Sequence, residues 1–522
     1  MKRYLSVPML LLTLALAVSV ASAAPLAAIV VPNPGTASSV IVIQNTDATN
    51  SAQWVLDFID QSGNAVAGAQ QTGTLPAYVA TAINVGNISV LGTGWNGSAI
   101  VSADRQVAAV GATTWTGGTS GDGTTAGEYL AFSEGSASIT FPYVFNSNRV
   151  TWLTVQNTGS SAATAYFTFV DRRTGTQTGS TTSVSIPAGA QRTYRMNDCS
   201  TGIVPTGACT RPNSNDEAEY WKGAVMVTST NPVLAGVAVT HWTLWSADYT
   251  SVSPAESANE LIFPLFYRVR TSGGVFGETR PWHRYSDVTI ANPDLTASVV
   301  ITVELFNSST GARDDWWTVS IPPGSAVGIN TRYAGNGNPA DWATRWPLKL
   351  GANWIGTAVV TAEPGRQVQG VNFNFWPQSS QNYVGGYNAV TRDAGAQRLF
   401  FPAAYRSGGS TIPLYSHIQV QNTANVSTTI DVYFFNRNQA NGGIGNAFYA
   451  LTTGLVIQPN SSIILNTKYN STGLPNNWFT ALGTSFDGSV VVISRDNPIT
   501  GIIYNLSQSP VRVSSYNGLP LD

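Results

Sequence analysis

The sequence predicts an all-β protein made of four tandem β-sandwich domains. The chain divides into short segments, four to eight residues long, in which apolar and polar side chains alternate. Turn residues, chiefly Asn or Asp followed by Gly or Pro, return every ~8–15 residues. One order of landmarks occurs four times along the 522 residues. Alternation indicates strands with one buried face, and the recurrence indicates tandem domains.

The amino terminus precedes the first repeat and has the pattern of an export signal. Lys2 and Arg3 are followed by an apolar run, and the small residues at 21–23 form a cleavage pattern. We therefore expect a cleaved signal peptide over residues 1–23 and a secreted, extracellular protein associated with the cell surface. No later apolar stretch approaches the ~18–20 residues of a membrane span, so we expect no membrane insertion after cleavage.

The composition restricts the partners. Only 10% of the residues are charged and the formal net charge is −2, so the chain has no basic footprint for nucleic acid. The hydrophobic share of 43% is enough for folded cores, so the low charge indicates a neutral surface and not disorder.

Each repeat begins with an apolar run that ends in Asn, as in "IVIQNT" at 41–46. The four Asn residues are Asn45, Asn157, Asn292 and Asn422. We expect each to end a strand in a turn, because Asn tolerates left-handed backbone and bonds the following backbone. Fourteen or fifteen positions later comes the opening residue of a Gly-containing turn, at Asp60, Asp171, Asn307 and Asn436.

Two further landmarks follow in each copy. The first is a Pro corner, in "TLPAY", "SIPAG", "SIPPG" and "VIQPN". The second is an aromatic two residues before Gly and a β-branched run, in "WNGSAIV", "WKGAVMV", "WIGTAVV" and "FDGSVVV". We predict that this aromatic plugs the core at a strand start; the alternative is a ligand role shared by all copies.

The last landmark is a Tyr in a short apolar segment, at Tyr129, Tyr249, Tyr387 and Tyr516. The landmarks divide the mature chain into repeats at 24–127, 128–250, 251–390 and 391–522. We expect independent beads, because a unit of about 110–130 residues can close its own core.

A unit of this length with about seven short strands fits a two-sheet sandwich of immunoglobulin-like type. Residues 153–196, "LTVQNTGSSAATAYFTFVDRRTGTQTGSTTSVSIPAGAQRTYRM", resemble the immunoglobulin-like modules found in tandem on bacterial surface and cell-adhesion-related proteins. The resemblance implies an extracellular setting and binding or scaffolding work.

The two cysteines, Cys199 and Cys209, lie in one Gly/Pro-containing loop. In an oxidising compartment we expect them to form a disulfide that acts as a local staple of roughly 2–3 kcal/mol. A redox or metal role has little support, because there is no Cys-x-x-Cys pattern.

The sequence offers few candidates for chemistry, and we expect no catalytic residue, no cofactor and no metal. His241, His283 and His417 stand at different landmarks, and we interpret His241 as packing or rim decoration. Two groups of acids leave calcium binding or glycosidase chemistry open as weaker alternatives. These acids are Asp216, Glu217 and Glu219, and the pair Asp314 and Asp315.

The third repeat is unusually rich in tryptophan. If residues 316–317 lie in a strand, Trp316 and Trp317 point to opposite faces and one of them is exposed. Together with Trp342 and Trp346, they form a candidate platform for a sugar ring or a protein partner. The alternative is that the loop around 338–350 packs onto the sheet.

Two functions follow. The first is a secreted, non-enzymatic structural or adhesion protein of the cell surface or extracellular matrix. Its partners would be other copies, joined head to tail or laterally through strand edges, and other surface proteins or glycans. The second is a secreted carbohydrate-binding protein that uses the aromatics of the third repeat. In the head-to-tail form, the segment around Tyr516 has no later domain and is donated to another chain.

Overall fold

The computed structural model describes residues 26–29, 36–116, 125–147, 149–210, 220–242, 246–270, 282–377, 382–407, 412–471, 474–508 and 511–521. The predicted signal peptide at 1–23 lies outside these residues. The described chain is dominated by strands, and every pairing between them is antiparallel. The predicted all-β class is confirmed.

The strands form five sheets, and three of these sheets share one strand order. In repeat 2 the order is β12 (Thr182–Ile186), β11 (Ala163–Asp171), β14 (Trp221–Thr228), β9 (Ser138–Asn146), β10 (Val150–Asn157), β15 (Leu234–His241) and β16 (Ser246–Thr250), with β13 (Gln191–Arg195) on β10. In repeat 3 it is β20 (Arg313–Ile321), β19 (Val299–Asn307), β22 (Asn353–Ala362), β17 (Glu260–Arg270), β18 (Trp282–Ala291), β23 (Gln369–Pro377) and β24 (Asn382–Asn388), with β21 (Ala326–Asn330) on β18 and β25 (Val390–Thr391) on β17.

Repeat 4 has the same order. It runs β29 (Tyr449–Ile457), β28 (Thr428–Asn436), β31 (Phe486–Ser494), β26 (Arg398–Ser407), β27 (Leu414–Asn422), β32 (Ile499–Gln508) and β33 (Val511–Asn517), with β30 (Ser462–Asn466) on β27 and β34 (Leu519–Leu521) on β26. Repeat 1 divides the order into two sheets. These are β1 (Leu26–Ile29), β6 (Gly97–Ala103), β3 (Ala52–Asp60) and β4 (Gln71–Leu75), and then β5 (Ala80–Asn84), β2 (Thr36–Asn45), β7 (Val107–Thr116) and β8 (Thr125–Leu130).

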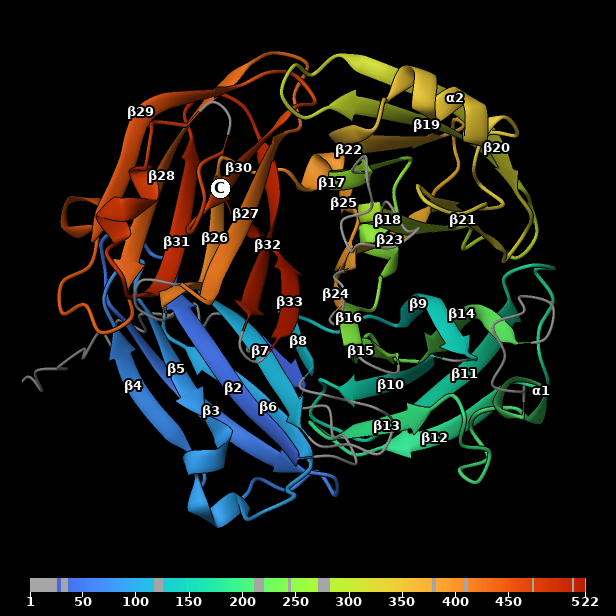
Figure 1. The fold of residues 1–522 in the computed structure, drawn as a ribbon. Coiled ribbons are helices and arrows are strands. Elements are labelled where there is room, and N and C mark those ends of the chain that lie inside the picture. The colour runs from blue at the N-terminus through green and yellow to red at the C-terminus, as the bar shows by residue number, and fades with distance from the viewer. Residues whose placement is uncertain are drawn as a thin grey trace, which may run out of the picture.

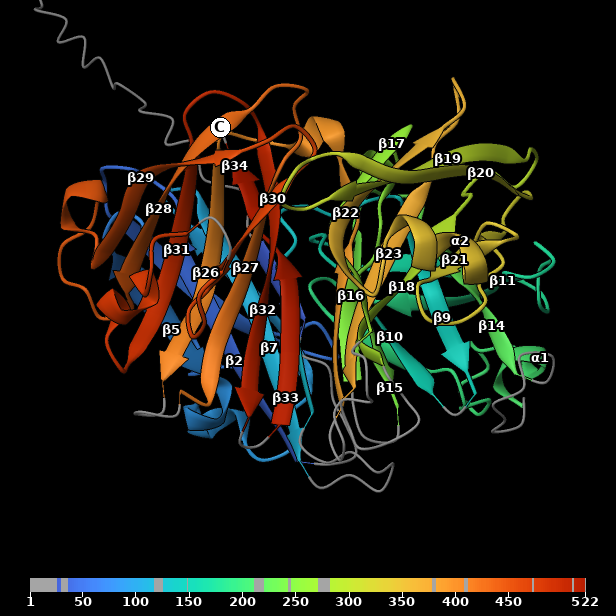
Figure 2. The same ribbon diagram turned by 45° about the horizontal axis from the view of Figure 1, so that its top comes forward.

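The four repeats are not separate beads. They surround a common centre, where β8, β16, β24 and β33 lie (Figure 1). Each of these four strands contacts the next, and β33 of the last repeat contacts β8 of the first. The chain therefore closes into a ring, and Figure 2 shows two of the central strands, β16 and β33, from a tilted view.

The buried clusters explain why the expectation of independent cores was wrong. The cluster of repeat 2 includes Phe373 of repeat 3, and the cluster of repeat 3 includes Tyr504 of repeat 4. A further cluster joins Tyr78 of repeat 1 to Phe435 of repeat 4. Strands such as β15 and β32 are buried on both faces, because one face packs on the core of its own repeat and the other is covered by neighbouring repeats.

The Tyr segments have a role that the sequence did not predict. Each pairs with the preceding strand of its own repeat, for example β33 with β32. The Tyr249, Tyr387 and Tyr516 hydroxyls donate to backbone carbonyls of their own repeats, at 2.7, 2.6 and 2.9 Å. The segment around Tyr516 thus finds its neighbours within its own chain, so the reason for expecting its donation to another chain no longer holds.

The recurring Asn supports the Pro corner. The Asn157 side chain donates to the Ile186 carbonyl at 2.9 Å and accepts from the Gly159 amide at 2.9 Å. The same pair of contacts occurs at the other three copies. The predicted bond to the following backbone is confirmed. Left-handed backbone lies instead at the last residue of each quoted Pro-corner segment, which we call the third corner residue. These residues are Tyr78, Gly189, Gly324 and Asn460.

Each Pro corner docks on the preceding repeat. The residue after the landmark Gly donates a hydroxyl to the third corner residue of the next repeat, from Ser98 to Gly189, Thr357 to Asn460 and Ser489 to Tyr78. The last of these bonds joins repeat 4 to repeat 1 and closes the ring. The second repeat has Ala224 at this position, so its boundary with repeat 3 lacks this bond. We call each boundary between neighbouring repeats a seam.

Candidate functional site

The four candidate tryptophans do not form one exposed surface. Trp316 on β20 is 50% exposed, whereas Trp317 is buried, so the prediction that one of the pair is exposed is confirmed. Trp346 is fully buried, and Trp342 packs against it with ring centroids 5.8 Å apart. This matches the packing alternative for the loop, and a ligand role for Trp316 stays a prediction.

The segment expected to be a loop contains a helix, α2 (Trp342–Lys349). Asp315 anchors it: this buried carboxylate accepts from Arg345 at 2.7 Å, Lys349 at 2.8 Å and the Trp346 indole at 3.1 Å. Burial raises the pKa of Asp315, but the bonds from Arg345 and Lys349 outweigh it and lower the pKa overall.

The acid next to it also has a structural partner. Asp314 accepts from the Trp354 indole at 2.7 Å. Both members of the acidic pair thus accept hydrogen bonds from neighbouring side chains. The other acids, Asp216, Glu217 and Glu219, lie outside the described residues.

The disulfide is confirmed, with Cys199 and Cys209 joined at the edge of repeat 2. Cys209 ends the short helix α1 (Thr206–Cys209), and the preceding Ala208 is buried in the core of the repeat. The bond therefore holds a loop against its own sheet.

The seam between repeats 1 and 2 is closed by aromatic rings. His241 lies between Trp115 of repeat 1 and Trp152 of repeat 2, with centroid distances of 5.4 and 4.8 Å. Burial lowers the pKa of His241 to about 3, so its ring is neutral at pH 7. The packing interpretation of His241 agrees with this position. The side chain of His283 lies outside the described residues.

The seam between repeats 4 and 1 is closed by apolar side chains. Tyr78 lies 5.9 Å from Phe400 and 5.6 Å from Phe435, ring centre to ring centre. Close to it Arg437 pairs with Asp487 at 2.6 Å. The charges of Arg437 and Asp487 therefore neutralise each other.

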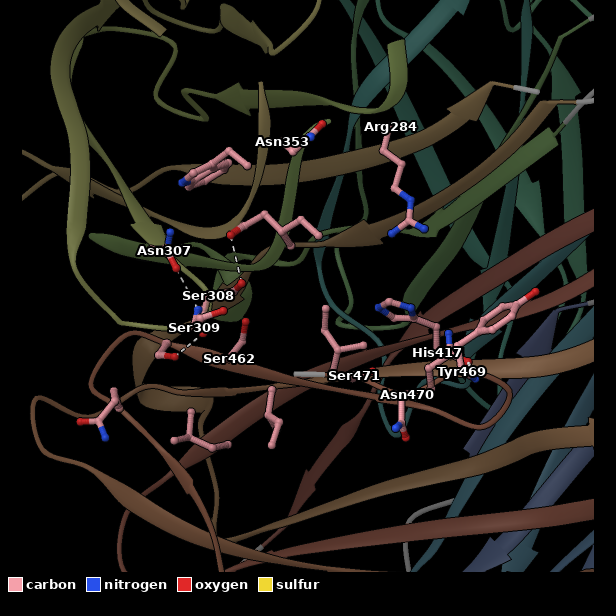
Figure 3. A pocket seen from close by; sticks show the side chains of 18 of the residues that line it. Arg284, Asn307, Ser308, Ser309, Asn353, His417, Ser462, Tyr469, Asn470 and Ser471 are labelled. Carbon is pink, nitrogen blue, oxygen red and sulfur yellow. Dashed lines mark hydrogen bonds between the residues drawn. The ribbon is translucent and has the colours of Figure 1, made fainter. Parts of the chain in front are cut away.

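The seam between repeats 3 and 4 contains a cavity of about 650 Å³ (Figure 3). Arg284 and His417 point toward each other across it, and burial lowers the pKa of His417 to about 3. Most of the other polar groups in its wall are neutral amides and hydroxyls, among them Asn307, Ser308, Ser309, Ser462, Asn466 and Asn470. With His417 neutral, this cavity offers many hydrogen-bonding groups and little charge.

The seam between repeats 2 and 3 contains a larger cavity, of about 930 Å³. It occupies the equivalent place, because Arg149 precedes Asn157 by the same eight residues that separate Arg284 from Asn292. Its wall is cationic and aromatic, with Arg149, Arg172, Arg173, Lys222, Tyr220, Trp242, Tyr285 and Tyr333.

Each of the two cavities has its own rim, and in both rims a cation lies against two tyrosine rings. Arg332 lies 5.1 Å from the Tyr285 ring and 4.7 Å from Tyr333. Lys468 lies 5.2 Å from Tyr415 and 5.1 Å from Tyr469 at the next seam. Sequence reasoning missed these rims, although a signal existed: "NTRY" at 330–333 and "NTKY" at 466–469 occupy equivalent places in repeats 3 and 4 and have no counterpart in the first two.

No protein-family model and no curated protein matches the chain. Within the described ranges, no helix is long and apolar enough to cross a membrane. Among the same residues, no group of three or more His, Cys, Asp or Glu side chains is placed to hold a metal ion. The two seams that contain cavities, between repeats 2 and 3 and between repeats 3 and 4, are the candidate binding sites that we consider further.

Proposed function

We propose that the protein is a secreted, non-enzymatic structural or adhesion protein of the cell surface or extracellular matrix. The closed ring carries this proposal, because the recurring residues serve to join repeats and leave the sheet edges available. The resemblance of residues 153–196 to immunoglobulin-like modules of bacterial surface proteins supports the same function.

Strand β29 is the edge that we propose to pair with another copy. It ends its sheet, and Val456 on it is 56% exposed. The corresponding edge strand β20 is partly covered, because Arg345 of α2 donates to the Trp316 carbonyl at 2.6 Å. Uncovered strand edges pair readily with strands of other chains.

Electron microscopy of the secreted protein tests the assembly. Wild-type protein should form filaments or sheets, and Val456→Lys should reduce them to single rings, because a charge on the pairing edge opposes stacking. Thr318→Lys, on the exposed face of the covered edge β20, is the matched control and should assemble normally. Single rings from the wild-type protein would exclude self-assembly.

A second candidate function is carbohydrate binding, and the weakly charged cavity between repeats 3 and 4 favours it. Amides, hydroxyls and the 48% exposed Tyr469 are suited to a hydroxyl-rich sugar. In a pull-down with neutral polysaccharides, Tyr469→Ala should weaken binding at this cavity, and Trp316→Ala would reveal any use of the exposed tryptophan. Tyr166→Ala, on the open face of β11, is the control.

A further inference from the structure

The seam between repeats 2 and 3 carries positive charge at a position that differs in every copy. Lys222 is the middle residue of "WKG", where repeat 3 has Ile355 and repeat 4 has Asp487. The neighbouring turn position is Arg172 in repeat 2 and Arg437 in repeat 4. Repeat 4 thus joins a cation to an anion, whereas repeat 2 sets two cations side by side.

These two cations are held close by the fold. The Arg172 amide donates to the Lys222 carbonyl at 3.1 Å, so the residues are neighbours across two strands. Both are more than nine-tenths buried. Like charges at neighbouring cross-strand positions repel, and burial strengthens the repulsion because water screens it less. An anion bound between them would be attracted by both charges.

A third cation points to the same place. The Arg149 guanidinium lies 3.9 Å from the centre of the Phe145 ring and donates to the Tyr143 hydroxyl at 3.2 Å. Its buried Nε has no hydrogen-bond partner among the described residues. Among the described residues of this cavity wall, four charged side chains are cations and one, Asp287, is an anion. One of the cations, Arg173, is already paired with Asp171 at 2.8 Å.

The rim of this cavity offers aromatic ring faces to a ligand. Tyr333 is 52% exposed and lies edge-to-face with Tyr285 at 5.9 Å. Such faces pack against the CH groups of sugar rings, and the neighbouring Arg332 adds another charge at the entrance.

A peptide that adds as a strand has no free edge here. The outer edge of β21 is already bonded by the following loop, since Gly328 N donates to Asn336 at 2.7 Å and Asn330 N to Asn338 at 3.0 Å. The Gly328 carbonyl accepts from Gly337 at 2.9 Å. Recognition must therefore use side-chain charge and ring faces.

We propose that the cavity between repeats 2 and 3 binds an acidic polysaccharide, whose carboxylates or sulfates meet Arg172, Lys222 and Arg149 while a sugar ring packs on Tyr333. The site goes beyond the proposed function. It is separate from the weakly charged cavity between repeats 3 and 4, and it does not depend on assembly through β29.

Two substitutions copied from repeat 3 test the site in the full secreted chain. Arg172→Ser and Lys222→Ile introduce the residues that repeat 3 carries, Ser308 and Ile355, at positions where the fold accepts them. Each should weaken binding of polygalacturonate about tenfold or more, because each removes a charge-assisted contact. Tyr333→Ala, at an exposed position, should weaken it several-fold without affecting folding.

The controls separate the possible ligands. Arg105→Ser removes the same charge from an exposed position in repeat 1 and should leave affinity unchanged. Dextran sulfate in place of polygalacturonate distinguishes sulfate from carboxylate, and neutral dextran should not bind at this site. Added salt should weaken binding, because it screens the charges.

The proposal is wrong if polygalacturonate and dextran sulfate both fail to bind, or if Arg172→Ser and Lys222→Ile bind like wild type. Poly-glutamate binding that depends on Arg172 and Lys222, without polysaccharide binding, would also overturn it and assign the site to an acidic protein. Thermal unfolding of each variant shows that a loss of binding is not a loss of fold.

Discussion

Tyr78 has a left-handed backbone, with φ of 66°, although it is neither Gly nor Asn. The equivalent corner positions in the other repeats are Gly189, Gly324 and Asn460, residue types that accept this conformation readily. The strained backbone is maintained because the ring of Tyr78 is 1% exposed and packs on Phe400 and Phe435 of repeat 4.

Tyr78→Ala should therefore lower the free energy of unfolding by about 3–5 kcal/mol, as for other large aromatic truncations in a core. Tyr78→Gly should be no more destabilising, because Gly relieves the backbone. Chemical denaturation measures both. Tyr166→Ala, at a 40% exposed position, should change stability by less than about 0.5 kcal/mol. A small effect at Tyr78 would mean that this seam does not support the ring.

Helix α2 is bonded to one side chain of its sheet, the Asp315 carboxylate on β20. The Asp315 carboxylate accepts from Arg345, Lys349 and Trp346 of the helix. The side chains of Arg345 and Lys349 remain partly exposed to water. The indole of Trp346 is fully buried, so it would lose its partner without the carboxylate.

Asp315→Ala should lower the free energy of unfolding by about 2–3 kcal/mol, because a buried donor loses its acceptor. The change should be visible in tryptophan fluorescence, since Trp346 lies at the contact. Asp341→Ala is the matched control: Asp341 is 3.7 Å from Arg345 but exposed, and such pairs contribute little. Equal effects of the two substitutions would contradict the anchoring role of Asp315.

At the scale of the whole molecule, the centre of the ring holds two buried carboxyl groups. Glu128 on β8 accepts from Asn505 of repeat 4 at 2.7 Å and so helps to close the ring. Burial raises the pKa of Glu128 to about 7, and burial together with the charge of Glu128 raises the pKa of Asp248.

These raised pKa values make ring stability depend on pH. Between about pH 4.5 and 7 the folded protein keeps the Glu128 proton that the unfolded chain releases, so stability falls as pH rises through this window. Glu128→Gln should thus be more stable than wild type at pH 8, by on the order of 3 kcal/mol, and about equal to it below pH 4.

The comparison must be made between variant and wild type at each pH. His241 and His417, whose pKa values burial lowers to about 3, act in the opposite direction, because folding excludes their protons and stability is lost as the pH falls below 6.5. Asp248 acts in the same direction as Glu128. If the stability difference between Glu128→Gln and wild type did not change with pH, Glu128 would not be the acid that makes ring stability depend on pH.

The local features could be predicted from the sequence because they depend on neighbouring residues. Alternation predicted the strands, the Asn of "QNT" predicted a bond to the following backbone, and the spacing of Cys199 and Cys209 predicted their disulfide. Alternation also predicted that Trp316 and Trp317 differ in exposure.

The tertiary structure alone decided how the repeats meet. No local pattern distinguishes an apolar outer face that meets water from one that meets another repeat, so independent beads and a closed ring predict the same strands. Tyr78 and Phe435 lie hundreds of residues apart in the chain, and only the ring brings them into contact. By itself the sequence determined an all-β chain of four copies. The packing of apolar faces decided that the copies close, and it left two of the four seams open as cavities.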